Sequence, residues 1–225
     1  PPLYYCIAKI VVDLWKLLVP AAETVMIIKL VSVMPYFLLL VYALTFLRRR
    51  FGIFPAGVFF FCIMSMPQMS AYTVEMRMYG FALLFVSAAF FHAYGIVCPD
   101  ECEGRQHAVL DQSVCTSPKR RLRGSSCTVH YAALTVYGLA AAYTQYFACV
   151  AVIMIYACLF VWFGFHRWKR QEKEAGKILR NLSFCVLASI IGYLPWFFVL
   201  LSQINTVRSN YWILPLTWRS LGGCV

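Results

Sequence analysis

The chain has 225 residues, of which 62% are hydrophobic, 17% aromatic and only 13% charged, and its formal net charge is +11. Soluble domains carry about 45–50% apolar and about 25% charged residues, so this composition excludes an ordinary soluble domain and indicates a membrane protein. The high positive charge also raises the question of nucleic-acid binding, which the distribution of Lys and Arg along the chain answers.

The first predicted element is an amphipathic helix over residues 3–19, LYYCIAKIVVDLWKLLV. Lys9, Asp13 and Lys16 are spaced so that they line one helical face, while the remaining positions are apolar or aromatic. This pattern is typical of a helix that lies in the membrane interface. We expect it on the outer face of the membrane; the alternative is a buried span that carries three charges.

Six stretches are then long and apolar enough to be spans, because a spanning helix needs about 20 mainly apolar residues. They cover about 29–47, 52–67, 78–97, 130–147, 148–165 and 182–201. A single helix over 130–165 would be about 54 Å long, against a hydrocarbon core of about 30 Å. Two short spans that meet at a turn over 143–146 fit better. The predicted fold class is all-α, a multi-pass transmembrane helical bundle.

Lys and Arg concentrate in three segments between these spans. The segments are the triplet Arg48–Arg50, the loop 98–129 and the loop 166–181, which together hold most of the 20 basic residues. Six spans place all three segments on one side, and Lys- and Arg-rich loops stay in the cytoplasm. Membrane orientation therefore accounts for the positive charge and excludes nucleic acid as a partner. We expect a multi-pass protein of the cell membrane.

Loop 98–129 also contains four of the 10 cysteines: Cys98, Cys102, Cys115 and Cys127. The first two have the spacing of half a zinc site, but the other two lie too far apart to complete the pattern. Unlinked thiols on a reducing face are the preferred interpretation, with zinc as the alternative. The sequence does not show what this loop does.

The segment 71–80, AYTVEMRMYG, connects the second and third spans on the outer face and carries two charges, Glu75 and Arg77. Residues two apart do not face each other on a helix, so we expect the two charges to meet different partners. One interpretation is an interfacial anchor. The other is a binding site, in which Arg77 beside a helix start holds an anion and Glu75 binds sugar hydroxyls or a metal ion.

Two further outer segments are polar and aromatic. The turn Tyr143-Thr144-Gln145-Tyr146 is one, and the stretch 210–215, NYWILP, is the other. Aromatic belts are common at membrane interfaces, which is the simpler explanation. Together with 71–80, these segments can wall a cleft for a lipid-linked ligand that bears a sugar.

Four motifs in this order resemble a known family: PPLYY at the start, YTVEMRMYGFALLF, AAYTQYFA and the late YWILPLT. The pattern is similar to bacterial multi-pass glycosyltransferases of family 39, the protein O-mannosyltransferase and lipid A aminoarabinose transferase type with the GT-C fold. The resemblance spans nearly the whole chain, and its most specific part is Glu75-x-Arg77-Met78-Tyr79. It implies a bacterial plasma-membrane enzyme that moves a hexose or pentose from a polyprenyl phosphate to an acceptor hydroxyl outside the membrane.

The resemblance also implies roles for residues. Arg77 would bind the donor phosphate, Glu75 the acceptor, the sugar or a divalent cation, and Tyr79, Tyr143 and Gln145 would shape the pocket. The catalytic carboxylate of relatives lies upstream of PPLYY, so we expect this chain to be a fragment that lacks it and is inactive alone. Relatives often have His at the position of Gln145. The acceptor, a lipid, a glycan or a protein, stays open.

Two other classes remain as alternatives. A transporter or flippase for lipid-linked sugars would need ionisable residues along a pathway inside the spans, and only Lys29 and His92 lie near predicted span ends. A non-catalytic membrane scaffold would bind a partner without turnover of the donor.

Overall fold

The computed structural model describes residues 2–65, 77–98, 124–170 and 173–209, and within these ranges all regular structure is helical. The order is α1 (Leu3–Leu18), α2 (Thr24–Tyr42), η1 (Ala43–Leu47), α3 (Arg48–Phe51), α4 (Ile53–Ser65), α6 (Tyr79–Val97), α7 (Gly124–Thr144), α8 (Tyr146–Arg170) and α9 (Lys173–Ser209). The prediction of an all-α protein is confirmed for the described part of the chain.

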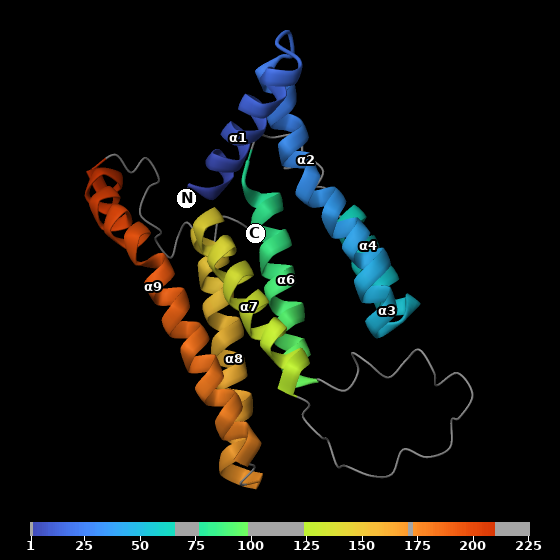
Figure 1. Cartoon of the computed structure of the whole chain (residues 1–225), viewed down its shortest axis with the longest axis vertical. Coiled ribbons are helices and arrows are strands. Elements are labelled where there is room, and N and C mark those ends of the chain that lie inside the picture. The colour runs from blue at the N-terminus through green and yellow to red at the C-terminus, as the bar shows by residue number, and fades with distance from the viewer. Residues whose placement is uncertain (1, 66–76, 99–123, 171–172, 210–225) are drawn as a thin grey trace, which may run out of the picture.

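The helices run back and forth between two ends of the molecule (Figure 1). The α1–α2 connection, the start of α6, the α7–α8 junction and the end of α9 lie toward the upper end in this view. The α3 segment, the end of α6, the start of α7 and the α8–α9 junction lie toward the lower end. We call these the upper end and the lower end.

Four helical segments in the described ranges are long and apolar enough to cross a membrane: Thr24–Leu47, Tyr79–Val97, Tyr146–Lys169 and Glu174–Gln203. A multi-pass membrane protein is therefore supported, but the prediction of six spans is not met by length and composition. Helix α4 has only 13 residues, or about 20 Å of helix. Helix α7 has 21 residues but is less apolar, with Gly, Ser, Thr and His along it.

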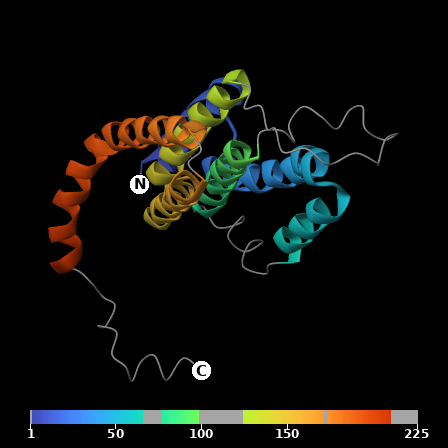
Figure 2. The same cartoon turned by 90° about the horizontal axis from the view of Figure 1, so that it is seen from below.

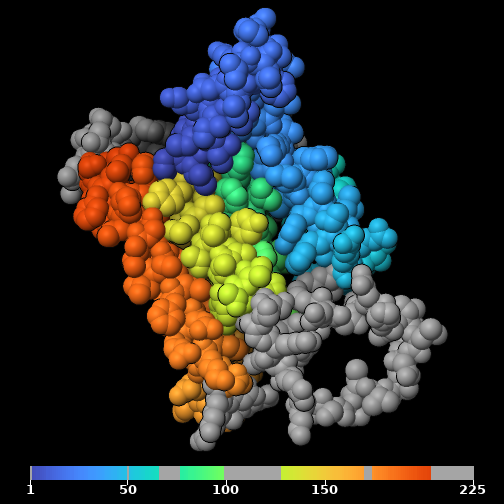
Figure 3. Space-filling view, viewed as in Figure 1, coloured from blue at the N-terminus to red at the C-terminus, as the bar shows by residue number. Residues whose placement is uncertain are grey.

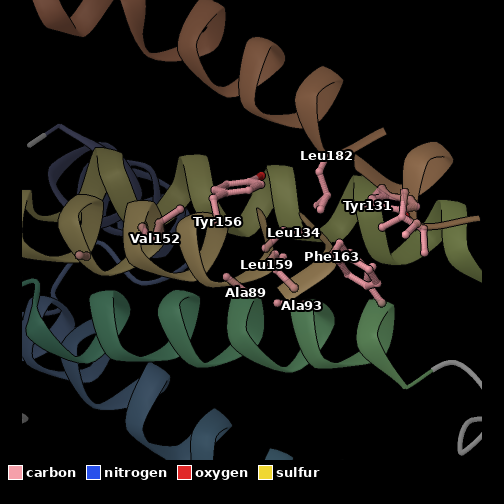
Figure 4. Close-up of a cluster of buried hydrophobic side chains, with 14 of the residues drawn as sticks. Ala89, Ala93, Tyr131, Leu134, Val152, Tyr156, Leu159, Phe163 and Leu182 are labelled. Atoms are coloured by element: carbon pink, nitrogen blue, oxygen red, sulfur yellow. The ribbon is translucent and has the colours of Figure 1, made fainter. Parts of the chain in front are cut away.

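The composition of α7 follows from its place in the bundle. It contacts α6, α8, α9 and α1, so much of its surface meets other helices instead of lipid. The core that it shares with α6, α8 and α9 combines alanines such as Ala89 and Ala93 with larger side chains such as Leu134 and Phe163 (Figure 4). Small residues let helix backbones approach closely, which is how helices associate in membranes. A hydropathy search therefore undervalues this helix.

The predicted loop 166–181 is wrong as a loop. Helix α8 continues to Arg170 and α9 already begins at Lys173, so most of the basic residues expected there lie on helix ends. Charged residues cannot lie in the hydrocarbon core, but they do not stop a helix from extending beyond it. The same effect moves the start of the first long span from 29 to Thr24 and that of α7 from 130 to Gly124.

Helix α1 covers the predicted range 3–19 almost fully, and it lies across the upper end (Figure 3). Its Tyr4 is 2% exposed and packs with Val31 of α2 and Phe81 of α6. The Tyr4 hydroxyl shares a 2.8 Å hydrogen bond with the Ser32 hydroxyl, which in turn donates to the Ile28 carbonyl at 3.0 Å. A buried polar pair of this kind fixes α1 against α2.

Helices α2 to α4 flank α6 on one side, whereas α9 lies on the other side of the bundle (Figure 2). A second aromatic cluster ties α3 and α4 to the lower part of α6, where Phe91 packs with Leu47 and Ala56. Helix α9 is curved in Figure 2, and it contains Pro195, whose missing N–H weakens the helix locally.

Candidate functional site

The predicted site residues that the structure describes lie at the upper end. Arg77 directly precedes α6, is exposed, and has its guanidinium carbon 6.0 Å from the centroid of the Tyr79 ring. This is the outer limit of a cation–π contact. The free N–H groups and the dipole at a helix start favour an anion, so a cation there adds to an existing preference.

The start of α6 is held by tight packing below Arg77. Met78 and Phe81 pack in the cluster of Tyr4. Gly80 lies so close to α2 that a Cβ at this position would be 3.0 Å from Cγ of Pro35. The two consecutive contacts fix where α6 begins, and hence where Arg77 and Tyr79 stand.

The α7–α8 junction is the second part of the upper end. Gln145 is the single residue between the two helices; its N–H donates to the Ala141 carbonyl and its carbonyl accepts from the Cys149 N–H, both at 3.1 Å. Ala141 and Ala148 belong to the same core cluster as Ala82 of α6. The junction therefore lies beside the first turn of α6, and the half-buried Gln145 belongs to the same end as Arg77 and Tyr79.

Tyr143 faces a different neighbour, α9. Its hydroxyl donates to the Gly192 carbonyl at 2.7 Å, and its ring centroid lies 5.5 Å from Tyr193 and 6.4 Å from Trp196. Gly192 also permits close approach of α7, because a Cβ there would be 2.9 Å from Cδ1 of Leu139. The Tyr143 hydroxyl thus joins α7 to α9, while its ring forms part of an aromatic group on the α9 side of the site.

Trp196 was not predicted from the sequence. Its indole nitrogen is buried and has no acceptor among the described residues. Nearby, the Tyr146 hydroxyl at the start of α8 lies 3.4 Å from Oε1 of Gln203, which links the junction to α9 once more. The spacing of Tyr193 and Trp196 by three residues on one helical face was the signal that a search for charged motifs overlooked.

Two predicted parts of the site, Glu75 and the stretch 210–215, lie outside the described residues. The described ranges contain no group of three or more His, Cys, Asp or Glu side chains that could hold a metal ion. A role for a divalent cation at Glu75 therefore stays a prediction.

Comparison of the chain with protein-family models, with curated proteins and with solved structures finds no match. What the geometry offers is an exposed arginine at a helix start, a neighbouring tyrosine and a half-buried amide, next to a helix that lies across the same end. This arrangement can hold an anionic group at one end of a membrane bundle.

Proposed function

We propose that this chain belongs to a membrane glycosyltransferase that moves a hexose or pentose from a polyprenyl phosphate to an acceptor hydroxyl. The supporting observation is that three of the four resembling motifs are found at one end of an all-helical bundle. PPLYY begins α1, Arg77-Met78-Tyr79 begins α6, and Gln145 separates α7 from α8. A donor with a lipid tail would enter from the bilayer beside these helices.

The chemistry assigns a role to each part. The bond between the anomeric carbon and the donor phosphate oxygen breaks, and the acceptor oxygen forms the new bond while a carboxylate base takes its proton. Negative charge develops on the departing polyprenyl phosphate, which Arg77 stabilises at the start of α6. Glu75 orients the acceptor, the sugar or a cation. The base itself belongs to the acidic segment expected upstream of Pro1.

The test is sugar transfer by the full-length enzyme in membranes. Arg77→Ala should lower the transfer rate about 100-fold or more, since removing one stabilising donor from a transition state costs about 10²–10³-fold. Glu75→Gln should lower it as well. Arg48→Ala is the matched control, because Arg48 is also an exposed arginine next to an apolar helix but lies at the lower end. Wild-type rates at normal membrane levels for Arg77→Ala and Glu75→Gln would remove these roles.

A transporter of lipid-linked sugars is the second candidate, and one observation favours it. Nδ1 of His92 and Nδ1 of His130 lie 2.9 Å apart between α6 and α7, and the His92 ring stacks on Tyr137 at 5.6 Å. Ionisable residues within a membrane bundle are often part of a transport path. Movement of a lipid-linked sugar across proteoliposomes without transfer to any acceptor, abolished by His92→Ala, would favour this candidate over the enzyme.

A further inference from the structure

The lower end contains a basic hollow where α8 ends and α9 begins. Its volume is about 280 Å³, and it is lined by Arg167, Gly176, Lys177, Leu179 and Arg180. The cations come from two helices: Arg167 from the last turn of α8, and Lys177 and Arg180 from the first turns of α9. Residues distant by more than a helical turn in sequence thus surround one space.

Gly176 decides how the Arg167 side chain lies. With no side chain at 176, the Arg167 guanidinium rests directly on the α9 backbone, and a Cβ at this position would clash with it. The clash would involve the far end of a flexible side chain, so a larger residue would displace the guanidinium without disturbing the helix. Gly176 therefore holds Arg167 at the hollow.

The charges around the hollow do not cancel. Lys177 is paired with Glu174 at 2.8 Å, one turn away on α9. Among the described residues, neither Arg167 nor Arg180 forms an ion pair, and both are exposed. Two guanidinium groups without a carboxylate offer planar, forked N–H donors, the geometry that suits phosphate oxygens.

The surroundings of the hollow are aromatic. Trp168, next to Arg167, is 84% exposed, and Trp162 and Phe165 on the same helix are 51% exposed each. Exposed Trp and Phe beside basic residues at the end of a spanning helix are typical of the membrane–water interface. A ligand of this hollow would therefore have its phosphate at head-group depth and apolar groups alongside.

We propose that the hollow between α8 and α9 binds a phosphate group through Arg167 and Arg180, with an anionic phospholipid as the ligand. Basic pockets between membrane helices are suited to anionic head groups. The preference of basic residues for the cytoplasmic side explains why they lie at this end. It does not explain why arginines from two helices, together with a glycine that seats one of them, line a single hollow.

The experiment is native mass spectrometry of the purified full-length protein in detergent, with phosphatidylglycerol or phosphatidylcholine added at equal concentrations. Wild-type protein should retain one phosphatidylglycerol and no phosphatidylcholine. Arg167→Gln and Arg180→Gln should each weaken retention about tenfold or more, because a hydrogen bond to a charged group contributes about 1.5–3 kcal/mol. Gly176→Ala should weaken it too, by displacing Arg167 while leaving every charge in place.

Lys169→Gln is the matched control. Lys169 lies between the same aromatic residues, with its ammonium 5.3 Å from the centroid of Phe165, but it does not line the hollow. It should retain the lipid as wild type does. Equal losses in Lys169→Gln and Arg167→Gln, or retention of phosphatidylcholine as well as phosphatidylglycerol, would overturn the site. Retention of inorganic phosphate in place of the lipid, lost in Arg167→Gln, would support the phosphate site and assign it to a soluble ligand.

Discussion

The two ends of the bundle are built differently. At the upper end, α1, α2 and α6 meet through buried neutral contacts, such as the Tyr4–Ser32 hydrogen bond and the close approach of Gly80 to Pro35. At the lower end, exposed cations on α8 and α9 surround an open hollow. The comparison teaches that geometry at the upper end depends on packing, whereas the lower end can lose charges and keep its fold. The predictions below test this contrast.

The largest effect expected is all-or-none and concerns sidedness. In a chain whose native cysteines are replaced, a cysteine at the exposed Asp13 of α1 and one at the exposed Glu174 of α9 should react with an impermeant maleimide from opposite sides of the membrane. The reason is that these positions belong to opposite ends of the bundle (Figure 1). Labelling of intact cells and of inverted vesicles measures it.

The control for sidedness is permeabilisation, after which both cysteines should react. Labelling of both positions from the same side of a sealed membrane would mean that the upper and lower ends face one compartment. That result would contradict the proposed separation of the Arg77 site from the basic hollow.

The next largest effect concerns packing at the upper end. Gly80→Val should lower the free energy of unfolding by about 1–3 kcal/mol or more, since overpacking a tight contact costs about that much. The added methyl groups would force α6 away from Pro35 of α2. The midpoint of thermal unfolding in detergent measures the loss.

Gly57→Val is the matched control, because a Cβ at Gly57 of α4 would meet nothing within 4 Å. It should leave the unfolding midpoint close to that of wild type. Equal losses in the two variants would show that glycine content of the helices, and not the α2–α6 contact, determines the stability of the upper end.

A smaller effect is expected at the α7–α9 contact. Tyr143→Phe removes the hydroxyl that donates to the Gly192 carbonyl at 2.7 Å, and hydrogen bonds between membrane helices contribute about 0.6 kcal/mol on average and at most about 1.7 kcal/mol. Thermal unfolding should therefore shift slightly, and sugar transfer by the full-length enzyme should fall in proportion to the protein that remains folded. A large loss of transfer with unchanged stability would instead assign the hydroxyl to ligand binding.

Much of the helical pattern could be predicted from the sequence. The amphipathic spacing of Lys9, Asp13 and Lys16 predicts α1, and the impossible length of one helix over 130–165 predicts a break, which the structure has at Gln145. Helix ends could not be predicted, because the basic residues after 166 mark the limit of the membrane and not of the helix. Hydropathy alone also could not reveal that α7 meets other helices more than lipid.

The candidate site could be predicted only in part. Arg77 and Tyr79 are adjacent in sequence, and their contact follows from that. The orientation of Tyr143 toward Gly192 depends on how α7 packs on α9, which no local pattern encodes. Likewise, Trp196 becomes a site residue only because α9 brings it beside Tyr143. Contacts between helices distant in sequence are the part that a single chain of letters leaves open.

The smallest effect is expected at the lower end, in the pair Glu174–Lys177. Glu174→Gln removes an exposed ion pair with a separation of 2.8 Å, and pairs at this helical spacing contribute about 0.2–0.5 kcal/mol. The unfolding midpoint should therefore stay within a degree or so of wild type, in contrast to Gly80→Val. The same substitution releases Lys177 from its carboxylate and adds a cation to the hollow, so retention of phosphatidylglycerol should rise. A rise without a change in stability would show that charges at this end serve a ligand and not the fold; destabilisation as large as that of Gly80→Val would remove the distinction between the two ends.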